Sequence, residues 1–244
     1  MWMEYGYVTT GAGAVWETDF DHDVLLRIDP VSDKVVATIP LGADSAPGGV
    51  AVTPGAVWVA DHHGGAISRI DPKTNRVVAT IPVGATGAAG PLTMMAGPEG
   101  VWVDVPNIGQ VVRIDPATNS VGLSVPLEGP VASDGKEIWI GVEAGPNGLP
   151  EVVRIDPVSG KIITAVDIIT AVNPDTQGGI GNLAIGLGSV WVTTASGLFR
   201  IDAATGRIVG RLDLNGDGGD VIVAGGSVWV TAEGKPYVLR ISPN

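Results

Sequence analysis

The sequence predicts an all-β fold, a six-bladed β-propeller with four-stranded antiparallel blades. The first observation is a tryptophan that returns at intervals of 37 to 52 residues by subtraction, at Trp16, Trp58, Trp102, Trp139, Trp191 and Trp229. The second is an arginine before isoleucine, 9 to 15 residues after each tryptophan, at Arg27, Arg69, Arg113, Arg154, Arg200 and Arg240. The third is the composition, because 36 Gly and 18 Pro with 16% charged residues are typical of short strands and tight turns. A strand-rich repeat of about 40 residues is the pattern of a propeller blade.

The second repeat shows the expected elements most clearly. Its four strands are expected at Val50–Thr53, Val57–Asp61, Ala66–Ile70 and Val77–Ile81. Between the third and fourth strands, proline follows an aspartate and presets φ, and the turn ends on a residue that tolerates the left-handed conformation. Such residues recur in five repeats, as Asp33, Asn75, Asn119, Gly160 and Gly206.

The last repeat is incomplete. Its third strand ends at Ile241 and the sequence stops at Asn244, so no fourth strand is expected there. The first strand of the first repeat occupies about Tyr7 to Thr10, which leaves only a short segment before it. We therefore expect a last blade of three strands, or one closed by an N-terminal stub that contains Trp2. Residues 1–244 are expected to form a single propeller domain, since all-β domains of about 200–250 residues are common.

The repeat resembles a known family. The residues Val57-Trp58-Val59-Ala60, followed by Ile70-Asp71 and by Thr74 to Gly84, resemble the YVTN-type propeller repeat. The resemblance covers nearly the whole chain and extends to virginiamycin B lyase-like propellers. It implies the fold, and it carries no site residue because the matched positions lie in strands and turns. The lyase resemblance also implies C–O bond cleavage with a divalent cation and a histidine late in the chain, whereas His63 is the last histidine here.

Composition excludes several classes of partner. The net charge of −12 disfavours nucleic acid and anionic membrane surfaces, because both require a basic surface. No apolar run reaches the roughly 20 residues of a membrane span, and residues 1–4 show no signal-peptide pattern. We expect a soluble protein, monomeric or dimeric through the incomplete blade, with a small-molecule substrate; the compartment stays open. The absence of cysteine excludes thiol nucleophiles and thiolate metal sites.

Variation in length indicates where a site lies. The loops between second and third strands, and the connectors between blades, vary in length, whereas the other turns do not. In a propeller the variable loops open on one face, and functional residues tend to occupy variable loops on a rigid frame. All three histidines and many carboxylates fall in these loops, although a merely solvated acidic rim is the alternative interpretation.

The candidate residues have three expected roles. The expected catalytic residues are His62, His63 and Asp61, with a histidine as general base. The expected ligands of a divalent cation (Ca²⁺, Mg²⁺ or Mn²⁺) are Asp104, Asn182 and Asp220. The expected substrate-binding residues are Tyr7, Thr93, Glu143, Asp175 and Glu233. No organic cofactor is expected, because no glycine-rich loop is followed by a helix that could bind phosphate.

Three functions are compatible with the sequence. The first is a metal-assisted hydrolase of an ester, lactone or phosphoester, as in similarly shaped lactonase, arylesterase and phosphotriesterase propellers. The second is a C–O lyase like virginiamycin B lyase. The third is a propeller that binds a ligand or protein without catalysis. We favour an enzyme, and the hydrolase first, because the variable loops and the polar residues coincide on one face.

Overall fold

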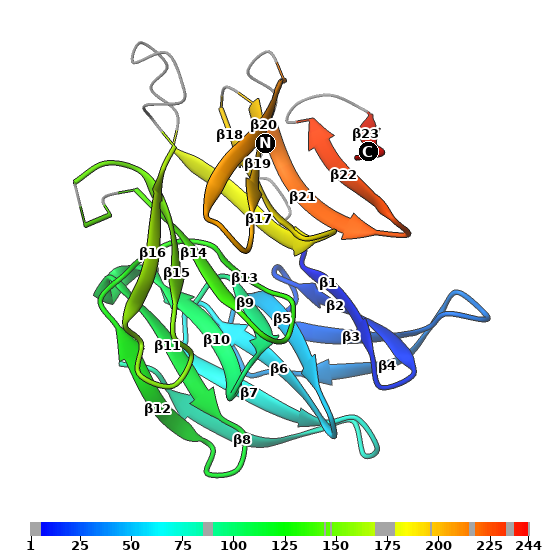
Figure 1. Ribbon diagram of the computed structural model, residues 1–244. Helices are drawn as coiled ribbons and strands as arrows, with labels where there is room; N and C mark the ends of the chain where they lie inside the picture. The colour runs from blue at the N-terminus through cyan, green and yellow to red at the C-terminus, as the bar shows by residue number, and fades with distance from the viewer. Residues whose placement is uncertain are drawn as a thin grey trace. The chain divides into compact units, whose positions relative to one another are not determined.

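The computed structural model describes most of the chain, and its regular structure is almost entirely β. The described residues are 6–84, 90–143, 145, 146, 148–168, 179–195, 197–214, 218–232 and 237–243. Their strands form six antiparallel sheets, here called blades 1 to 6 in chain order (Figure 1). One 3₁₀ turn, η1 (Pro106–Ile108), accompanies them.

Blades 1 to 3 belong to one compact unit, residues 1–126, here called unit 1. Blade 1 contains β1 (Val8–Gly11), β2 (Ala14–Asp19), β3 (Val24–Asp29) and β4 (Lys34–Pro40). Blade 2 contains β5 (Pro47–Thr53), β6 (Ala56–Asp61), β7 (Ala66–Asp71) and β8 (Arg76–Pro82). Blade 3 contains β9 (Met94–Gly97), β10 (Gly100–Val105), β11 (Gln110–Asp115) and β12 (Ser120–Val125). In each blade consecutive strands pair as neighbours, as a meander requires.

Blades 4 to 6 belong to a second compact unit, residues 127–244, here called unit 2. Blade 4 contains β13 (Val131–Ser133), β14 (Ile138–Val142), β15 (Glu151–Ile155) and β16 (Ile162–Asp167). Blade 5 contains β17 (Ile180–Gly186), β18 (Ser189–Thr194), β19 (Gly197–Asp202) and β20 (Arg207–Asp213). Blade 6 contains β21 (Gly218–Ala224), β22 (Ser227–Ala232) and β23 (Val238–Ile241). The predicted six-bladed propeller with a three-stranded last blade is thus confirmed for the described residues, whereas Trp2 lies outside them.

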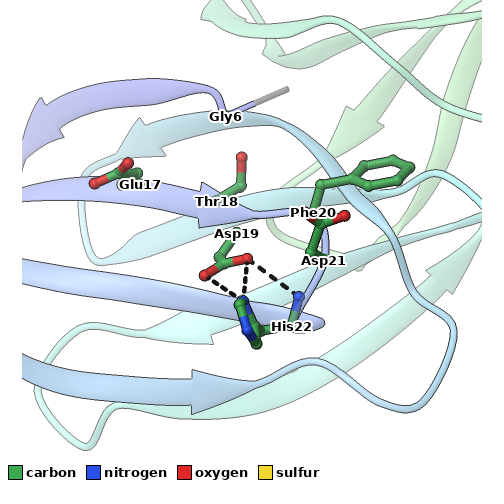
Figure 2. A pocket seen from close by; sticks show the side chains of 7 residues that line it. All are labelled: Gly6, Glu17, Thr18, Asp19, Phe20, Asp21 and His22. Atoms are coloured by element: carbon green, nitrogen blue, oxygen red, sulfur yellow. Dashed lines mark hydrogen bonds and ion pairs between the residues drawn. The ribbon is translucent and has the colours of Figure 1, made fainter. Parts of the chain in front are cut away.

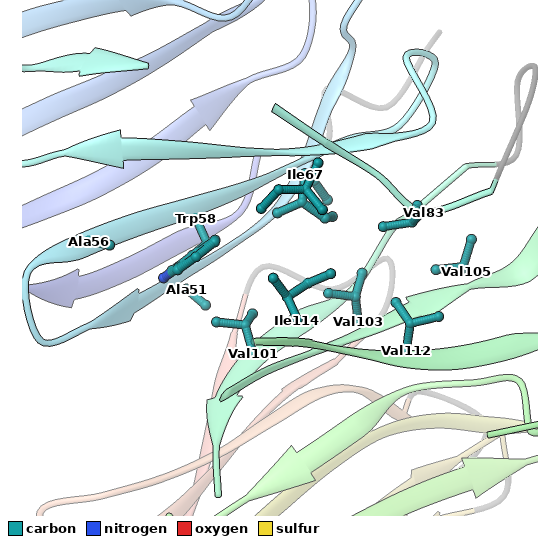
Figure 3. Packing of buried hydrophobic residues seen from close by; sticks show 12 residues of the cluster. Ala51, Ala56, Trp58, Ile67, Val83, Val101, Val103, Val105, Val112 and Ile114 are labelled. Atoms are coloured by element: carbon teal, nitrogen blue, oxygen red, sulfur yellow. The ribbon is translucent and has the colours of Figure 1, made fainter. Parts of the chain in front are cut away.

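Strand β6 shows why the second strand of a repeat is so apolar. Its side chains alternate between two cores, so that both of its faces are buried. Val57 and Val59 pack toward blade 1, whereas Trp58 and Ala60 pack toward blade 3. Figure 3 shows Trp58 lying close to the apolar side chains of blade 3. A strand between two packed sheets therefore reads as a continuous apolar run.

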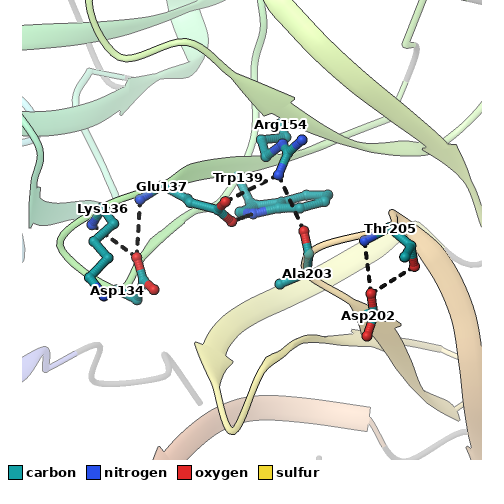
Figure 4. A network of polar contacts seen from close by, with 8 residues as sticks. All are labelled: Asp134, Lys136, Glu137, Trp139, Arg154, Asp202, Ala203 and Thr205. Carbon is teal, nitrogen blue, oxygen red and sulfur yellow. Dashed lines mark hydrogen bonds and ion pairs between the residues drawn. The ribbon is translucent and has the colours of Figure 1, made fainter.

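In blades 1, 2 and 4 the repeated arginine links its own blade to the next one. The Arg69 guanidinium lies 5.0 Å from the centroid of the Trp58 ring in its own blade. Its Nη1 donates to the Pro116 carbonyl (2.9 Å) and to Asn119 Oδ1 (2.5 Å) in the next blade. Arg154 repeats this in unit 2, where Nη1 donates to the carbonyl oxygen of Ala203 beside the Trp139 ring (Figure 4).

The repeated aspartate fixes the turn between the third and fourth strands. In blade 2 the Asp71 carboxylate accepts hydrogen bonds from the Lys73 amide (2.8 Å) and the Thr74 hydroxyl (3.1 Å). These bonds, led by the Lys73 amide, hold the pKa of Asp71 below its ordinary value. The turn ends at Asn75 with φ of +55°, which confirms the predicted left-handed position. The tryptophan, arginine and aspartate of the repeat thus have structural contacts, and the candidate site lies at other positions.

Candidate functional site

The histidines of the chain lie in loops of blades 1 and 2. Three segments gather there: the end of β2 with the β2–β3 loop (19–23), the connector after β4 (41–46) and the end of β6 with the β6–β7 loop (61–65). We call these three segments the unit 1 rim. Hydrogen bonds link them, because the Asp23 carbonyl accepts from the Leu41 amide (3.0 Å) and the Ser45 carbonyl accepts from the His63 amide (3.1 Å). All three histidines of the sequence therefore belong to one bonded group of loops.

A cavity of about 320 Å³ lies against the β2–β3 loop. Its lining consists of Gly6, Glu17, Thr18, Asp19, Phe20, Asp21 and His22 (Figure 2). The Asp19 carboxylate contacts His22 Nδ1 through both oxygens, at 2.8 and 2.9 Å, and Asp19 Oδ1 also accepts from the His22 amide. The described lining residues include three carboxylates and no lysine or arginine, so they favour neutral or cationic ligands over anions.

A second imidazole–carboxylate pair lies beside this cavity. His63 Nδ1 is 3.0 Å from Asp44 Oδ1, and the His63 side chain is 32% exposed. The Phe20 ring, which lines the cavity, meets the His63 ring edge-on with centroids 5.8 Å apart. The His62 ring lies 5.6 Å from that of His63, and its Nδ1 is 3.3 Å from the Pro91 carbonyl. Phe20 thus connects the cavity to the pair whose imidazole is the more buried of the two.

Asp61, expected as a catalytic residue with the two histidines, is buried with 4% exposure at the end of β6. Its Oδ2 accepts a hydrogen bond from the Ser68 hydroxyl (2.7 Å), and its Oδ1 has no partner among the described residues. Burial raises the pKa of Asp61 to about 7, against the smaller lowering effect of Ser68. The carboxylate bonded to His63 is therefore Asp44, and Asp61 is bonded to a serine.

The first-strand residues predicted for substrate or metal share a backbone motif. The hydroxyl of Thr18 accepts from the Tyr7 amide (3.0 Å), and in blade 5 Thr193 does the same for the Asn182 amide (3.0 Å). In blade 6 the Thr231 hydroxyl accepts a hydrogen bond from the Asp220 amide (2.7 Å). In blades 5 and 6 the bonded amides lie at register shifts in β17 and β21, so each threonine hydroxyl pairs an amide at an irregularity of the first strand.

In blade 3 a hydrogen bond between backbone groups is found at the position where blades 1, 5 and 6 use a threonine hydroxyl. The Thr93 carbonyl accepts from the Asp104 amide (2.9 Å), and Asp104 is buried with 5% exposure. The Thr93 hydroxyl is buried without a hydrogen-bond partner among the described residues.

The structure brings two of the three predicted metal ligands together. Asn182 Nδ2 donates to Asp220 Oδ1 (2.8 Å), while Asn182 Oδ1 accepts from the Leu183 amide (2.7 Å). The amide oxygen that would bind a cation is thus engaged by the backbone. Within the described part of the chain, no group of three or more imidazole or carboxylate side chains gathers as cation ligands. In this arrangement the pair does not fit a cation unless the Asn182 side chain turns.

The remaining predicted residues lie elsewhere. The exposed Glu143 accepts from the Ile180 amide (2.7 Å) and so ties blade 4 to blade 5. Asp175 and Glu233 lie outside the described residues. Sequence reasoning did not single out Asp19, His22 and Asp44. The sequence nevertheless indicated them, because each carboxylate stands in a segment of variable length in the same two repeats as the histidines.

Comparison with solved structures shows that the fold is a known one. Virginiamycin B lyase from Staphylococcus aureus gives a TM-score of 0.77 at 20% identity, over 96% of this chain and 79% of that chain. Its catalytically inactive histidine-to-alanine variant with quinupristin gives 0.72 at 16%, over 93% and 76%. Kuenenia stuttgartiensis hydrazine synthase gives 0.75 at 16%, over 92% and 72%. The resemblance to lyase-like propellers is thus confirmed at the level of the fold.

No protein-family model and no curated protein sequence matches the chain. No helix among the described residues is long and apolar enough to cross a membrane.

Proposed function

We propose that the chain is a small-molecule lyase that breaks a C–O bond at the unit 1 rim, with His63 as general base. The observation that carries the proposal is the 3.0 Å contact between His63 Nδ1 and Asp44 Oδ1. A carboxylate can only accept, so the shared proton sits on Nδ1 and the neutral ring presents a lone pair at Nε2. A histidine oriented in this way is the commonest general base in enzymes.

The proposed step is an elimination. Nε2 of His63 takes the proton from a carbon next to a carbonyl group. The electrons of that C–H bond form a C=C bond, and the neighbouring C–O bond breaks to release a carboxylate. The imidazolium, stabilised by Asp44, then returns its proton to solvent, so that no water enters the product. General base catalysis of this kind contributes about 10²- to 10⁴-fold to a rate.

The cavity beside Phe20 supplies the binding space. Its volume of about 320 Å³ lies at the lower end of the roughly 300–1,000 Å³ of small-molecule sites. Its aromatic wall contacts His63, so a ligand held against Phe20 lies near the proposed base. The likeness to a lyase that loses activity with one histidine supports this reaction class, although it assigns no residue here.

The metal-assisted hydrolase remains a second candidate, and one observation favours it. Asn182 and Asp220, predicted from sequence as ligands, lie in the first strands of blades 5 and 6, with Asn182 Nδ2 2.8 Å from Asp220 Oδ1. A Ca²⁺, Mg²⁺ or Mn²⁺ ion held there would supply Lewis-acid activation of water, and Asn182 would have to turn its oxygen outward.

Product analysis with and without a chelator separates the candidates. We expect turnover within a panel of quinupristin, lactones, aryl esters and phosphotriesters, with a product that has gained no water and contains a new C=C bond. Mass spectrometry and ultraviolet absorbance measure both properties. A product that has gained water, and whose formation stops in EDTA and resumes with Mn²⁺, would establish the hydrolase. Binding of panel members without turnover would instead indicate a non-catalytic propeller.

A further inference from the structure

We propose that Asp23 is a positioning residue for the His63–Asp44 pair. It lies in the β2–β3 loop and acts through the connector that carries Asp44. The inference rests on the proposed function for its catalytic consequence, whereas its structural consequence can be measured without any substrate.

The Asp23 carboxylate binds three successive residues of the connector. Its Oδ2 accepts from the Asp44 amide (2.9 Å), and its Oδ1 accepts from the Ala46 amide (2.8 Å) and the Ser45 hydroxyl (3.2 Å). Its own carbonyl accepts from the Leu41 amide (3.0 Å). One residue therefore holds the connector at both ends of the segment that presents Asp44.

The connector needs such a restraint. Asp44 and Ala46 have φ of +60° and +44°, in the left-handed region that residues with a Cβ seldom occupy. Conformations of this kind persist where surrounding contacts over-determine them. The Asp44 side chain is also 87% exposed, so water and rotamer freedom compete with its bond to His63 unless its backbone is fixed.

The connector and the β2–β3 loop also contact His63 at its backbone amide and at its ring. The Ser45 carbonyl accepts from the His63 amide (3.1 Å), so the connector binds this residue through both backbone and side chain. The Phe20 ring, three residues before Asp23 in the same loop, contacts the His63 ring. The position of the imidazole thus depends on the connector that Asp23 restrains.

At the position of Asp23, blades 2 and 3 have a glycine, so the carboxylate is specific to blade 1 among these three blades. Seven residues after the tryptophan, blades 2 and 3 have Gly65 and Gly109, with φ of +62° and +63°. Asp23 keeps the same left-handed turn, with φ of +56°, although glycine adopts it without strain. The bonds that it accepts, led by the Ala46 amide, hold the pKa of Asp23 below its ordinary value. The side chain is therefore ionised at neutral pH, as a threefold acceptor should be.

Asp23→Gly is the decisive variant, because it installs the residue that blades 2 and 3 have at this turn. We expect a folded protein in which ¹⁵N NMR shows that the neutral His63 ring has lost its preference for the proton on Nδ1. We expect kcat on the substrate found above to fall about 10- to 100-fold, as small misplacements of catalytic groups do, with KM within about twofold. Asp23→Asn, which retains one acceptor oxygen and tolerates left-handed φ, should lie between wild type and Asp23→Gly in both measurements.

Asp33→Gly is the matched control. Asp33 is also a left-handed aspartate of blade 1, with φ of +54°, and its amide donates to the Asp29 carbonyl in a turn between the third and fourth strands. It should change neither the His63 tautomer nor kcat. An unchanged His63 tautomer in Asp23→Gly, or in Asp23→Asn if the glycine variant does not fold, would overturn the positioning role. A changed tautomer in an enzyme whose rate does not depend on His63 would instead leave the role standing and overturn the proposed function.

Discussion

Replacing Trp58 by alanine is expected to lower the free energy of unfolding by about 3–5 kcal/mol, the usual cost of removing a large aromatic side chain from a core. Trp58 is fully buried between blades 2 and 3, where it packs with Ile67, Val101 and Ile114. Its indole nitrogen donates to the Thr53 hydroxyl (2.8 Å), which loses this partner in the variant. Urea denaturation followed by far-ultraviolet circular dichroism measures the change.

Val78→Ala is the control for this experiment. Val78 lies on the outer strand of the same blade and is 56% exposed, so its truncation should stay within about 0.5 kcal/mol of wild type. A loss of less than about 1 kcal/mol for Trp58→Ala would contradict the assignment of the repeated tryptophan to the core between blades.

Raising the pH is expected to destabilise the protein through Asp61. The folded-state pKa of about 7 lies well above the ordinary value of 3.8. Between these values the unfolded chain releases a proton that the folded chain retains, so stability falls as pH rises from about 4 to about 7 and then levels off. At about 1.4 kcal/mol per pKa unit, the full loss is on the order of 4 kcal/mol.

Asp61→Asn should abolish this loss, because the amide does not ionise. The measurement is the free energy of unfolding of both proteins from pH 5 to pH 8, where we expect wild type to lose stability relative to the variant. Ser68→Ala, which removes the hydroxyl that favours the ionised form, should move the midpoint of the loss to higher pH. A constant difference between wild type and Asp61→Asn across this range would contradict the buried, neutral carboxyl group.

The fold could be predicted from the sequence because every repeat has the same pattern of buried residues and turns. The alternation around Trp58 predicted β6, and Asp71 to Asn75 predicted the turn that the structure shows. Strand β5 nevertheless begins at Pro47, three residues before the predicted start, because Pro47 pairs across to Asp61 beyond a register shift. Such irregularities leave no periodic signal in the sequence.

The pairing of side chains in the site could not be predicted from sequence. Asp44 meets His63 from 19 positions earlier in the chain, through a connector whose left-handed residues include an alanine. The neighbours of such a loop depend on hydrogen bonds like those of Asp23, which no repeat encodes. Asp61 was predicted as a catalytic residue with the histidines, whereas its carboxylate is buried and accepts a hydrogen bond from Ser68. The residue types of the site were therefore predictable, and their partners were not.

Whether chemistry takes place at His63 is tested most directly by the kcat/KM of His63→Gln beside that of Asp220→Asn. Glutamine keeps a polar side chain but cannot act as a base at neutral pH. We expect His63→Gln to lose about 10²- to 10⁴-fold in kcat/KM and Asp220→Asn to stay within about twofold of wild type. Unchanged turnover in His63→Gln, with the loss appearing in Asp220→Asn, would contradict the claim and move the reaction to blades 5 and 6.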